Sequence, residues 1–345
     1  MKLAHHRFAI HPKVPFAISR SSTTVYERVL IRLSDDAGVE GWGEAAPNVF
    51  YRETADTVVA ALARLTRVVE RARTVDSLHD IDVLEEWMRT ENPGDSSARA
   101  AISVAAHDLL GKKLGTPLWR LFEAEPAHMP LSSFTIAIST DDAEVRRRIE
   151  EAHQYPVLKI KLGTDRDEWT VRIVRQGASN KTLRADANAG WTRERAPHMV
   201  GVLADNGFEL VEQPLAPDDL AGLKVLRDFS PIPVIADESC RTASDIPALD
   251  GVVHGINIKL SKCGGLAEAR RMISEARRRD LKVMLGCMIE SSLGITAAAH
   301  LAPLVDYVDL DGAALLSDDP YVGATMDAGM IRLPSAPGLG VSIRD

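Results

Sequence analysis

The sequence has little cysteine, few aromatic residues, no excess of basic charge and no long apolar run. Only three of 345 residues are cysteine, at 240, 263 and 287. Their odd number argues against a disulfide framework, and their spacing does not match a zinc site. Lysine and arginine number 41 against 49 aspartate and glutamate, a net charge of −8, so nothing indicates nucleic-acid binding. No stretch has the length of a membrane span or resembles a signal peptide. We therefore expect a cytoplasmic protein with neither nucleic-acid nor membrane partners.

What the sequence does contain is two regions with different periodicity. The segment TTVYERVLIRLSDDAGVEGWGEAAP holds two strand-like runs joined by a turn at residues 35–38. From Glu53 to about Leu114 the apolar spacing becomes helical. Strands followed by helices, without alternation, predict a separate α+β domain, which we place at residues 1–120. The tail at 319–345 is rich in glycine and proline and is predicted to return to this domain.

From about residue 130, short apolar runs alternate with amphipathic helical stretches. Eight runs spaced roughly one βα unit apart indicate a parallel barrel. We predict an α/β fold, a TIM-like (β/α)8 barrel in the modified (β/α)7β form at residues 121–318, with the α+β region as a capping domain. The expected strands are 132–138, 157–162, 182–188, 208–214, 232–239, 254–260, 282–290 and 305–312.

Charged residues occupy inward-facing positions late in these strands. In LKIKL (158–162), alternation places the apolar residues on one face and Lys159 and Lys161 on the other. Helices cover the outside of a barrel, so both lysines should point inside. A buried unpaired charge is costly, and charge on strand after strand therefore favours an active site over packing. The other inward residues are Asp186, Glu212, Asp237, Lys259, Asp309 and Asp311.

Three of the acids, Asp186, Glu212 and Asp237, come from adjacent strands and form an all-oxygen cluster. Hard oxygen ligands suit Mg²⁺, and no histidine or cysteine accompanies them as zinc would prefer. Lys161 precedes this cluster and Lys259 follows it, so the two lysines should face each other across a closed barrel. A substrate carboxylate held by one Mg²⁺ per subunit would then lie between two amines.

This arrangement suggests removal of a proton next to a carboxylate. A divalent metal stabilises the enediolate that forms. A lysine can take the proton when burial and neighbouring cations lower its pKa, and Lys159 and the metal supply positive charge beside Lys161. With lysines on both sides, the proton can leave one face and return to the other. The sequence therefore predicts 1,1-proton transfer, which is racemisation or epimerisation.

Several motifs resemble those of one enzyme family. KIK, DANAGW, VEQP, ADES and NIKLSKCGG are similar to the muconate-lactonizing-enzyme subgroup of the enolase superfamily, in which a lysine base and Mg²⁺ act together. GWGEAAP and ARAAISVAAHDLLGKKLGTPLWRLF look like its capping domain, so the resemblance covers nearly the whole chain. Within the subgroup, CMIESSLGITAAAH and DLDG are most similar to dipeptide epimerases.

The resemblance implies an isomerase that converts L-Xaa-L-Xaa to L-Xaa-D-Xaa. Its partner would be a small dipeptide, its cofactor Mg²⁺, and its assembly a homo-oligomer. Lys159 would assist Lys161 and contact the substrate carboxylate. The resemblance implies catalysis by Lys161 and Lys259 and metal binding by Asp186, Glu212 and Asp237.

The inward face of the last strand predicts the substrate class. Asp309 and Asp311 could pair with barrel lysines, but two carboxylates there need more positive charge, which a free α-ammonium supplies. The resemblance implies the same role for this Asp-x-Asp, and capping loops at 16–21 and 48–53 that close over the substrate. The substrate-binding residues so expected are Asp309, Asp311, Thr135, Arg20, Ser21, Phe50, Tyr51 and Ile289.

One position departs from family members that act on Ala-Glu. These carry a first-loop arginine that pairs with the glutamate side chain, whereas an ungapped alignment puts Ser21 there and Arg20 one residue earlier. Phe16, Ile18, Phe50 and Tyr51 make apolar or neutral second residues at least as plausible. The open alternatives are o-succinylbenzoate synthase or muconate cycloisomerase chemistry, N-acylamino-acid racemisation, and a non-enzymatic metal-carboxylate binder. The intact set of lysines and carboxylates argues against the last.

Overall fold

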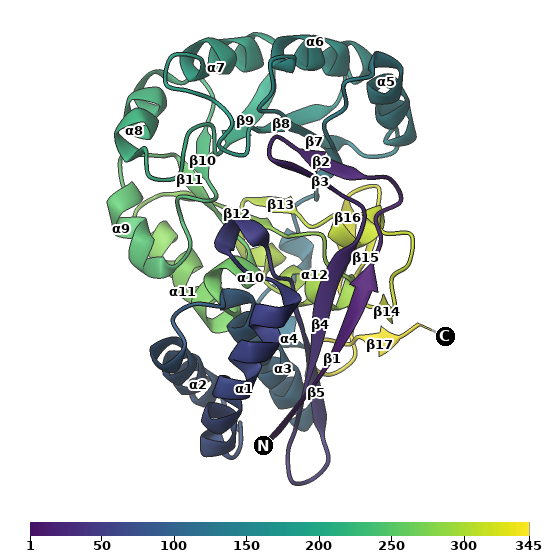
Figure 1. Cartoon of the computed structure of the whole chain (residues 1–345), viewed down its shortest axis with the longest axis vertical. Helices are drawn as coiled ribbons and strands as arrows, with labels where there is room; N and C mark the ends of the chain where they lie inside the picture. Colours follow the sequence, from purple (N-terminus) through teal and green to yellow (C-terminus); the bar gives the residue numbers. More distant parts are fainter. Residues whose placement is uncertain (345) are drawn as a thin grey trace.

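The computed structural model describes residues 1–344, in which a parallel barrel packs against an antiparallel sheet and three helices (Figure 1). The sheet of the first unit has the strand order β1-β4-β5. The turn predicted at residues 35–38 is confirmed, because Asp35 Oδ1 accepts hydrogen bonds from the N–H groups of Ala37 and Val39. Its elements are β1 (Lys2–Ile10), β2 (Phe16–Ile18), β3 (Ser21–Thr23), β4 (Tyr26–Ser34), β5 (Glu40–Ala45), η1 (Val49–Tyr51), α1 (Ala55–Ala72), α2 (Leu78–Glu91), α3 (Ser96–Lys113), α4 (Leu118–Leu121) and η2 (Pro126–His128).

Glycine allows α3 to pack directly on β5. A Cβ at Gly43 would lie 2.0 Å from Ala101 O, and one at Gly41 would lie 2.0 Å from Ala105 O. The alanine-rich face of α3 meets these two glycines, so backbone approaches backbone and the helix is buried along nearly its whole length.

The second unit is the predicted barrel. Eight parallel strands run in the order β6 to β13, and Ser132 pairs with Val308 to bring the first strand beside the last. Helices connect the strands, and no α-helix follows β13 in the described chain, which confirms the modified (β/α)7β form. The strands are β6 (Phe134–Ile136), β7 (Val157–Lys161), β8 (Thr182–Asp186), β9 (Phe208–Glu212), β10 (Val234–Ala236), β11 (Gly255–Ile258), β12 (Lys282–Gly286) and β13 (Tyr307–Asp309).

Helices cover the outer face of the barrel, as Figure 1 shows for α5 to α9. Their apolar faces contact the outward residues of the strands, such as Leu158, Ile160 and Ile258, which are fully buried. The helices are α5 (Asp142–Glu151), α6 (Asp167–Gly177), α7 (Ala196–Asp205), α8 (Leu220–Phe229), α9 (Ile246–Leu249), α10 (Leu260–Cys263), α11 (Leu266–Arg277) and α12 (Ser292–Ala299), with short turns η3 (Ala243–Asp245), η4 (Ala302–Leu304) and η5 (Gly312–Leu315).

The barrel interior changes from apolar to charged along the strands. Leu210, Ile235 and Met284 form a small apolar cluster inside. Two residues after Leu210 comes Glu212, and two after Ile235 comes Asp237, so the charged layer lies one step nearer the carboxyl ends. The predicted inward positions are thus confirmed, and the charge is concentrated at the rim where barrel enzymes carry their sites.

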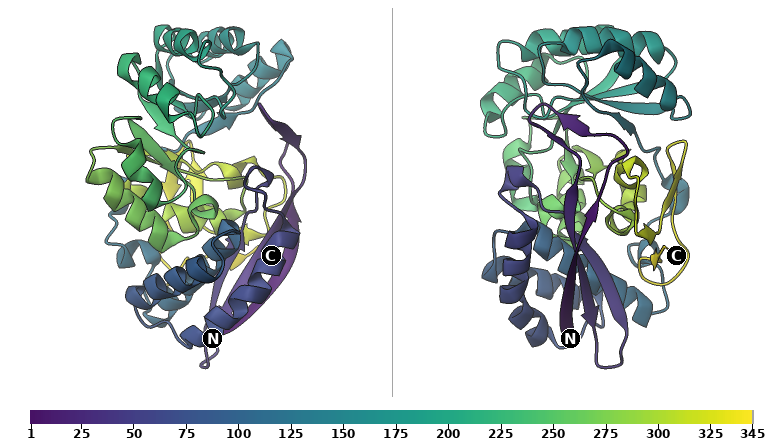
Figure 2. Two further views of the ribbon diagram at one scale, coloured as in Figure 1. Left: turned by 60° about the vertical axis from the view of Figure 1, so that its left-hand side comes forward. Right: turned by 45° about the vertical axis from the view of Figure 1, so that its right-hand side comes forward.

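Residues of the tail contact the first unit and the segment that follows it. Leu339 N donates to Asp108 Oδ1 at 2.7 Å, and Trp119 Nε1 donates to Pro334 O at 3.2 Å. Figure 2 shows this segment beside the N-terminal sheet. Its strands are β14 (Tyr321–Val322), β15 (Thr325–Asp327), β16 (Met330–Arg332) and β17 (Ser342–Ile343). The domain boundaries at 120 and 318 stay a prediction.

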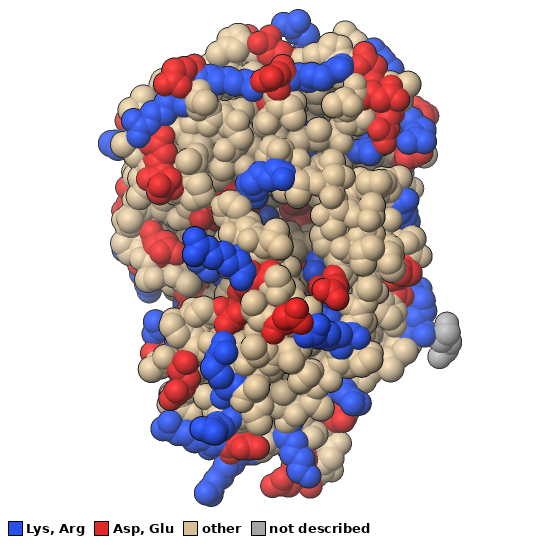
Figure 3. All heavy atoms as spheres, in the orientation of Figure 1, with Lys and Arg blue, Asp and Glu red and all other residues tan. Residues whose placement is uncertain are grey.

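Two surface properties bear on partners. None of the helices in residues 1–344 is both long and apolar enough to cross a membrane. On the face drawn in Figure 3, acidic and basic side chains are interspersed, and neither sign forms a continuous field.

Candidate active site

A cavity of about 460 Å³ lies between the capping loops and the carboxyl ends of the barrel strands. Most of the predicted site residues line it. Lys159, Asp186 and Glu212 do not line it but are buried in the barrel interior. The predicted residues in its wall are Arg20, Ser21, Phe50, Tyr51, Thr135, Lys161, Asp237, Lys259, Ile289, Asp309 and Asp311.

On one side of the site, two lysines from β7 meet the carboxylates of β8 and β9. Lys161 Nζ donates to Asp186 Oδ2 at 2.6 Å. Lys159 Nζ lies 3.1 Å from Asp186 Oδ2 and 2.6 Å from Glu212 Oε2. The register aligns Lys161, Asp186 and Glu212 on neighbouring strands, so the alternation of the strands alone brings these groups together.

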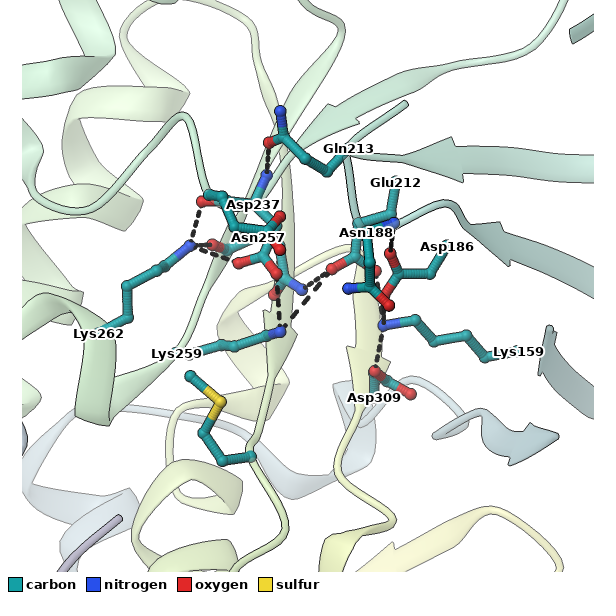
Figure 4. Close-up of polar contacts among 12 residues, drawn as sticks. Lys159, Asp186, Asn188, Glu212, Gln213, Asp237, Asn257, Lys259, Lys262 and Asp309 are labelled. Atoms are coloured by element: carbon teal, nitrogen blue, oxygen red, sulfur yellow. Dashed lines mark hydrogen bonds and ion pairs between the residues drawn. The ribbon is translucent and has the colours of Figure 1, made fainter. Parts of the chain in front are cut away.

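On the other side, Lys259 reaches the same cluster from the end of β11. Its Nζ donates to Asp237 Oδ2 at 2.8 Å and lies 4.0 Å from Glu212 Oε1. Asn257 Nδ2 donates to Glu212 Oε1 at 2.7 Å. Figure 4 shows Lys159 and Lys259 entering from opposite sides, with the carboxylates between them. Lys161, the lysine predicted to oppose Lys259, also lies on β7, which is four strands from β11 in the eight-stranded barrel.

A glycine makes room for Lys259. Gly286 ends β12, and a Cβ there would lie 2.8 Å from the Asn257 side chain and 3.1 Å from Lys259 Cε. Any side chain at this position would press on the lysine.

The close charges shift the pKa values of the cluster. Burial lowers the pKa of Lys159, but Asp309, Glu212 and Asp186 raise it more, so it lies well above the ordinary lysine value. Burial likewise lowers the pKa of Lys259, yet Asp237 and Glu212 raise it well above that value. Burial, together with the charge of Asp186, raises the pKa of Glu212 to about 7. Burial would also raise the pKa of Asp186, but the surrounding lysines lower it below its usual range. Both lysines therefore hold their protons in this arrangement.

The carboxylates have the chemistry of a hard-cation site. Among residues 1–344, no three Asp, Glu, His or Cys side chains stand as a preformed metal cage, and lysine ammonium groups lie between the acids. Asp186, Glu212 and Asp237 nonetheless supply only oxygen donors, all buried. Glu212 Oε2 has the Lys159 ammonium group 2.6 Å away as its ion-pair partner. Three buried carboxylates at one rim of the barrel offer the oxygen ligands that a divalent cation such as Mg²⁺ prefers.

Asp309 and Asp311 have different surroundings. Asp309 accepts hydrogen bonds from Lys159 Nζ and Ser133 Oγ, both at 2.6 Å, so it pairs with a barrel lysine. Asp311 Oδ2 accepts from Thr135 N at 2.6 Å, and no cation of the described chain lies within 4.0 Å of it. Burial, with the charge of Asp309, raises the pKa of Asp311 to about 7. Asp311 thus lines the cavity as a carboxylate without a counterion.

Both capping loops contribute to the cavity wall. Arg20 follows β2 and reaches the barrel, where its Nη2 donates to Glu238 Oε1 at 2.8 Å. Phe50 and Tyr51 in η1 stack edge to face with ring centroids 5.1 Å apart. Ile289 O accepts from Arg28 Nε at 3.0 Å, which fixes the loop after β12 against the capping sheet.

The prediction missed several residues of the site, among them Lys262, Gln213 and Glu238. Lys262 Nζ, fully buried, donates to Asp237 Oδ1 and to Asn257 O, both at 2.7 Å. Gln213 Oε1 accepts from Asp237 N at 2.9 Å and from Ser239 N at 3.1 Å, which shapes the turn after β10. The third is Glu238. All three lie inside motifs already singled out, and the one-turn helical spacing from Lys259 to Lys262 was the available signal.

The comparisons agree with this geometry. Residues 3–122 match the family model "Mandelate racemase / muconate lactonizing enzyme, N-terminal domain", and residues 141–345 match "Enolase C-terminal domain-like". An L-Ala-D/L-amino acid epimerase of Maribacter sp. is 38% identical, covering 99% of both chains. A hydrophobic dipeptide epimerase of Flavobacteria bacterium strain MS024-2A is 36% identical, covering 100% of this chain and 99% of the relative.

Solved structures agree as well. A dipeptide epimerase from Enterococcus faecalis V583, complexed with Mg and L-Leu-L-Tyr, superposes with a TM-score of 0.92 at 31% identity, covering 99% of each chain. The fold, the two family models and the full-length relatives all indicate the same family. The chain belongs to the mandelate racemase/muconate lactonizing enzyme family of the enolase superfamily.

Proposed function

We propose that this protein is a Mg²⁺-dependent dipeptide epimerase that removes the α-proton of the C-terminal residue of an L,L-dipeptide and returns a proton to the opposite face. The observation that supports this most is the position of Lys161 and Lys259. They come from opposite sides of the barrel, line one cavity and meet one cluster of carboxylates. Relatives across the full length are named epimerases of dipeptides.

The proposed metal ligands are Asp186, Glu212 and Asp237, with one Mg²⁺ per chain. Their buried, all-oxygen donors, which meet at one rim of the barrel, fit this ion. When bound, Mg²⁺ supplies positive charge that stabilises the charge developing on the substrate carboxylate and offsets the acids that hold protons on the lysines. The solved Enterococcus faecalis relative is complexed with Mg and a dipeptide.

The two lysines carry the proton transfer. One takes the α-proton from its face, and the other, still protonated, donates to the far face of the planar anion. Lys159 is unsuited to be the base, because it does not line the cavity and its ammonium group is paired with Asp186, Glu212 and Asp309. We assign it a fixed positive charge beside the substrate carboxylate, which favours the anion.

Asp311 is the proposed partner of the substrate's free α-ammonium. It lines the cavity and is hydrogen-bonded to Thr135, and its carboxylate retains acceptor capacity for an ammonium group. Asp309 is already paired with Lys159, so it contributes less directly. A substrate ammonium at Asp311 favours a dipeptide over an N-acylamino acid, which has no such charge.

The test is hydrogen exchange in D₂O. The wild type should incorporate deuterium at the α-carbon of the C-terminal residue of L-Ala-L-Met while forming L-Ala-D-Met. Lys161→Met and Lys259→Met should each abolish epimerisation, and each should retain exchange only from the diastereomer whose α-proton faces the remaining lysine. Unchanged epimerisation in either variant would refute the two-base scheme.

N-acetyl-methionine separates the alternatives, since an acylamino-acid racemase should process it at least as well as the dipeptide.

For the assembly we propose a homo-oligomer, which light scattering coupled to size-exclusion chromatography tests. For the location we propose the cytoplasm, supported by Cys240, Cys263 and Cys287, which are all unpaired thiols. Cell fractionation tests the location.

A further inference from the structure

An ion pair stands in the cavity wall where the capping hairpin meets the barrel. Arg20 Nη2 donates to Glu238 Oε1 at 2.8 Å, and its Nη1 donates to Asn188 O at 2.5 Å. The guanidinium carbon lies 4.3 Å from the centroid of the Phe50 ring. One side chain thus connects the β2–β3 hairpin, the second capping loop and the ends of two barrel strands.

The two partners differ in exposure. The Arg20 side chain is 32% exposed, whereas that of Glu238 is 2% exposed. Glu238 Oε2 is buried and accepts no hydrogen bond. Glu238 is therefore a buried anion whose only cation within ion-pair distance, in residues 1–344, is Arg20. Removing that cation would leave an unpaired charge beside the cavity.

The same cavity wall also holds uncharged side chains beside the charged groups of the proposed catalytic cluster. The Arg20–Glu238 pair itself carries no net charge. The apolar and aromatic wall residues from the capping loops and from the loop after β12 include Phe16, Ile18, Phe50, Tyr51, Met288 and Ile289.

We propose that Glu238 cancels the charge of Arg20 and so makes the subsite for the second residue's side chain select an uncharged group. This rests on the proposed dipeptide epimerase activity. A glutamate side chain would have to draw Arg20 away from Glu238 and leave that carboxylate buried without a partner. A lysine side chain would have to displace Arg20 from Glu238. A neutral side chain disturbs neither partner.

The pair predicts two opposite changes of specificity. Glu238→Gln keeps a hydrogen-bond acceptor for Arg20 and removes the charge, so Arg20 becomes free to bind an anionic second residue. Arg20→Met keeps an apolar stem against Phe50 and leaves Glu238 unpaired, which favours a cationic second residue. In each variant, a substrate side chain of opposite charge would pair with the residue that the substitution leaves without its partner.

A different role for the pair is mechanical, because it fastens the hairpin over the cavity. Loss of a mechanical fastening would reduce turnover of every dipeptide by a similar factor. Loss of charge cancellation changes the ratio between substrates of equal shape and different charge. Gln and Glu side chains form one such matched pair, and Met and Lys side chains form another.

The experiment compares kcat/KM for L-Ala-L-Gln, L-Ala-L-Glu, L-Ala-L-Met and L-Ala-L-Lys. In the wild type we expect kcat/KM for L-Ala-L-Gln to exceed kcat/KM for L-Ala-L-Glu by about tenfold or more. In Glu238→Gln that ratio should fall by about tenfold or more, and in Arg20→Met the Met-to-Lys ratio should fall similarly. Glu86→Gln on α2 is the matched control, because Glu86 pairs with Arg89 on the exposed helix surface and does not line the cavity. Its ratios should stay near those of the wild type.

The double variant Arg20→Gln/Glu238→Gln guards against misfolded single variants. It has no unpaired charge and should restore the preference for Gln over Glu. Ratios that stay at the wild-type value in every variant, or a wild type that prefers Glu, would overturn the inference while leaving the epimerase intact. If the wild type epimerises none of the four dipeptides, the proposed function itself fails.

Discussion

Single residues at this site differ in whether their charge is already balanced. Asp309 accepts hydrogen bonds from Lys159 and Ser133, whereas Asp311 is hydrogen-bonded to Thr135 and has no cation within ion-pair distance in residues 1–344. Two acids that look equivalent in the sequence, at positions i and i+2 of one strand end, therefore have different capacity for a ligand. The one without a counterion is the better candidate for binding an ammonium group.

Asp311→Asn should lower kcat/KM for L-Ala-L-Met by several hundredfold or more, since losing one partner of a buried charged pair removes about 3–5 kcal/mol. The rate with N-acetyl-methionine, however small, should not change by a similar factor, because this compound carries no ammonium. Steady-state rates with both substrates check the prediction. An equal loss on both would contradict it and indicate general damage to the site.

At the scale of elements, consecutive strands each contribute one group to a shared site. β8 and β9 end in Asp186 and Glu212, and Asp237 follows β10 directly. The strands are parallel, so their carboxyl ends meet at the same rim and the three acids converge.

Mg²⁺ should raise the thermal unfolding midpoint of the protein, because a ligand that binds only the folded chain stabilises it. Glu212→Gln should greatly reduce this shift, and EDTA should reverse it and abolish turnover. Asp228→Asn, which removes an exposed acid on α8, should retain the full shift. A shift of unchanged size in Glu212→Gln would place the ion elsewhere.

The last residue of β12 is Gly286, which has no side chain to contact Lys259. Gly286→Ala should lower kcat about tenfold to a hundredfold, because the new Cβ would press on Asn257 and on Lys259 Cε. Deuterium exchange from L-Ala-L-Met and from L-Ala-D-Met should be affected unequally, since only one lysine moves. Gly201→Ala on α7, where an added Cβ meets nothing within 4 Å, should leave turnover unchanged. Equal exchange losses from both diastereomers would argue against displacement of one lysine.

At the scale of the whole molecule, buried polar contacts join segments far apart in the sequence. His300, which follows α12, is completely buried. Its Nδ1 accepts from Trp119 N at 3.2 Å, and its Nε2 faces Leu339 O at 3.1 Å. Both contacts are satisfied by a neutral ring with the proton on Nε2, and burial lowers the pKa of His300 to about 4.

This histidine predicts a loss of stability in acid. The unfolded ring binds a proton below about pH 6.5 and the folded ring only below about pH 4, so the free energy of unfolding falls as the pH drops through that window. The contribution of His300 is about 3 kcal/mol over the window. His300→Gln should be less stable at pH 7.5 but show a shallower decline between pH 6.5 and 4. Urea unfolding at several pH values measures it, and parallel declines in both proteins would contradict it.

The sequence by itself determined the strands, their inward faces and the identity of the charged groups. A strand alternates with period two, so local pattern fixes the face on which Lys161 or Asp186 lies. Repetition of βα units fixes a parallel order, and that order brings carboxyl ends to one rim. The family motifs and the metal-ligand set could be predicted for this reason.

Only the tertiary structure decided which charges are partners. Arg20 meets Glu238 from a distant part of the chain, and Lys159 meets Asp309 only because the barrel closes between its first and last strands. An ion pair depends on separations of a few ångströms, which a periodic pattern does not specify. For the same reason the pattern did not predict the contact between Lys262, one helical turn after Lys259, and Asp237. The alternation along each strand determines the face on which a side chain lies, and the closed barrel with its capping loops determines which residues that side chain contacts.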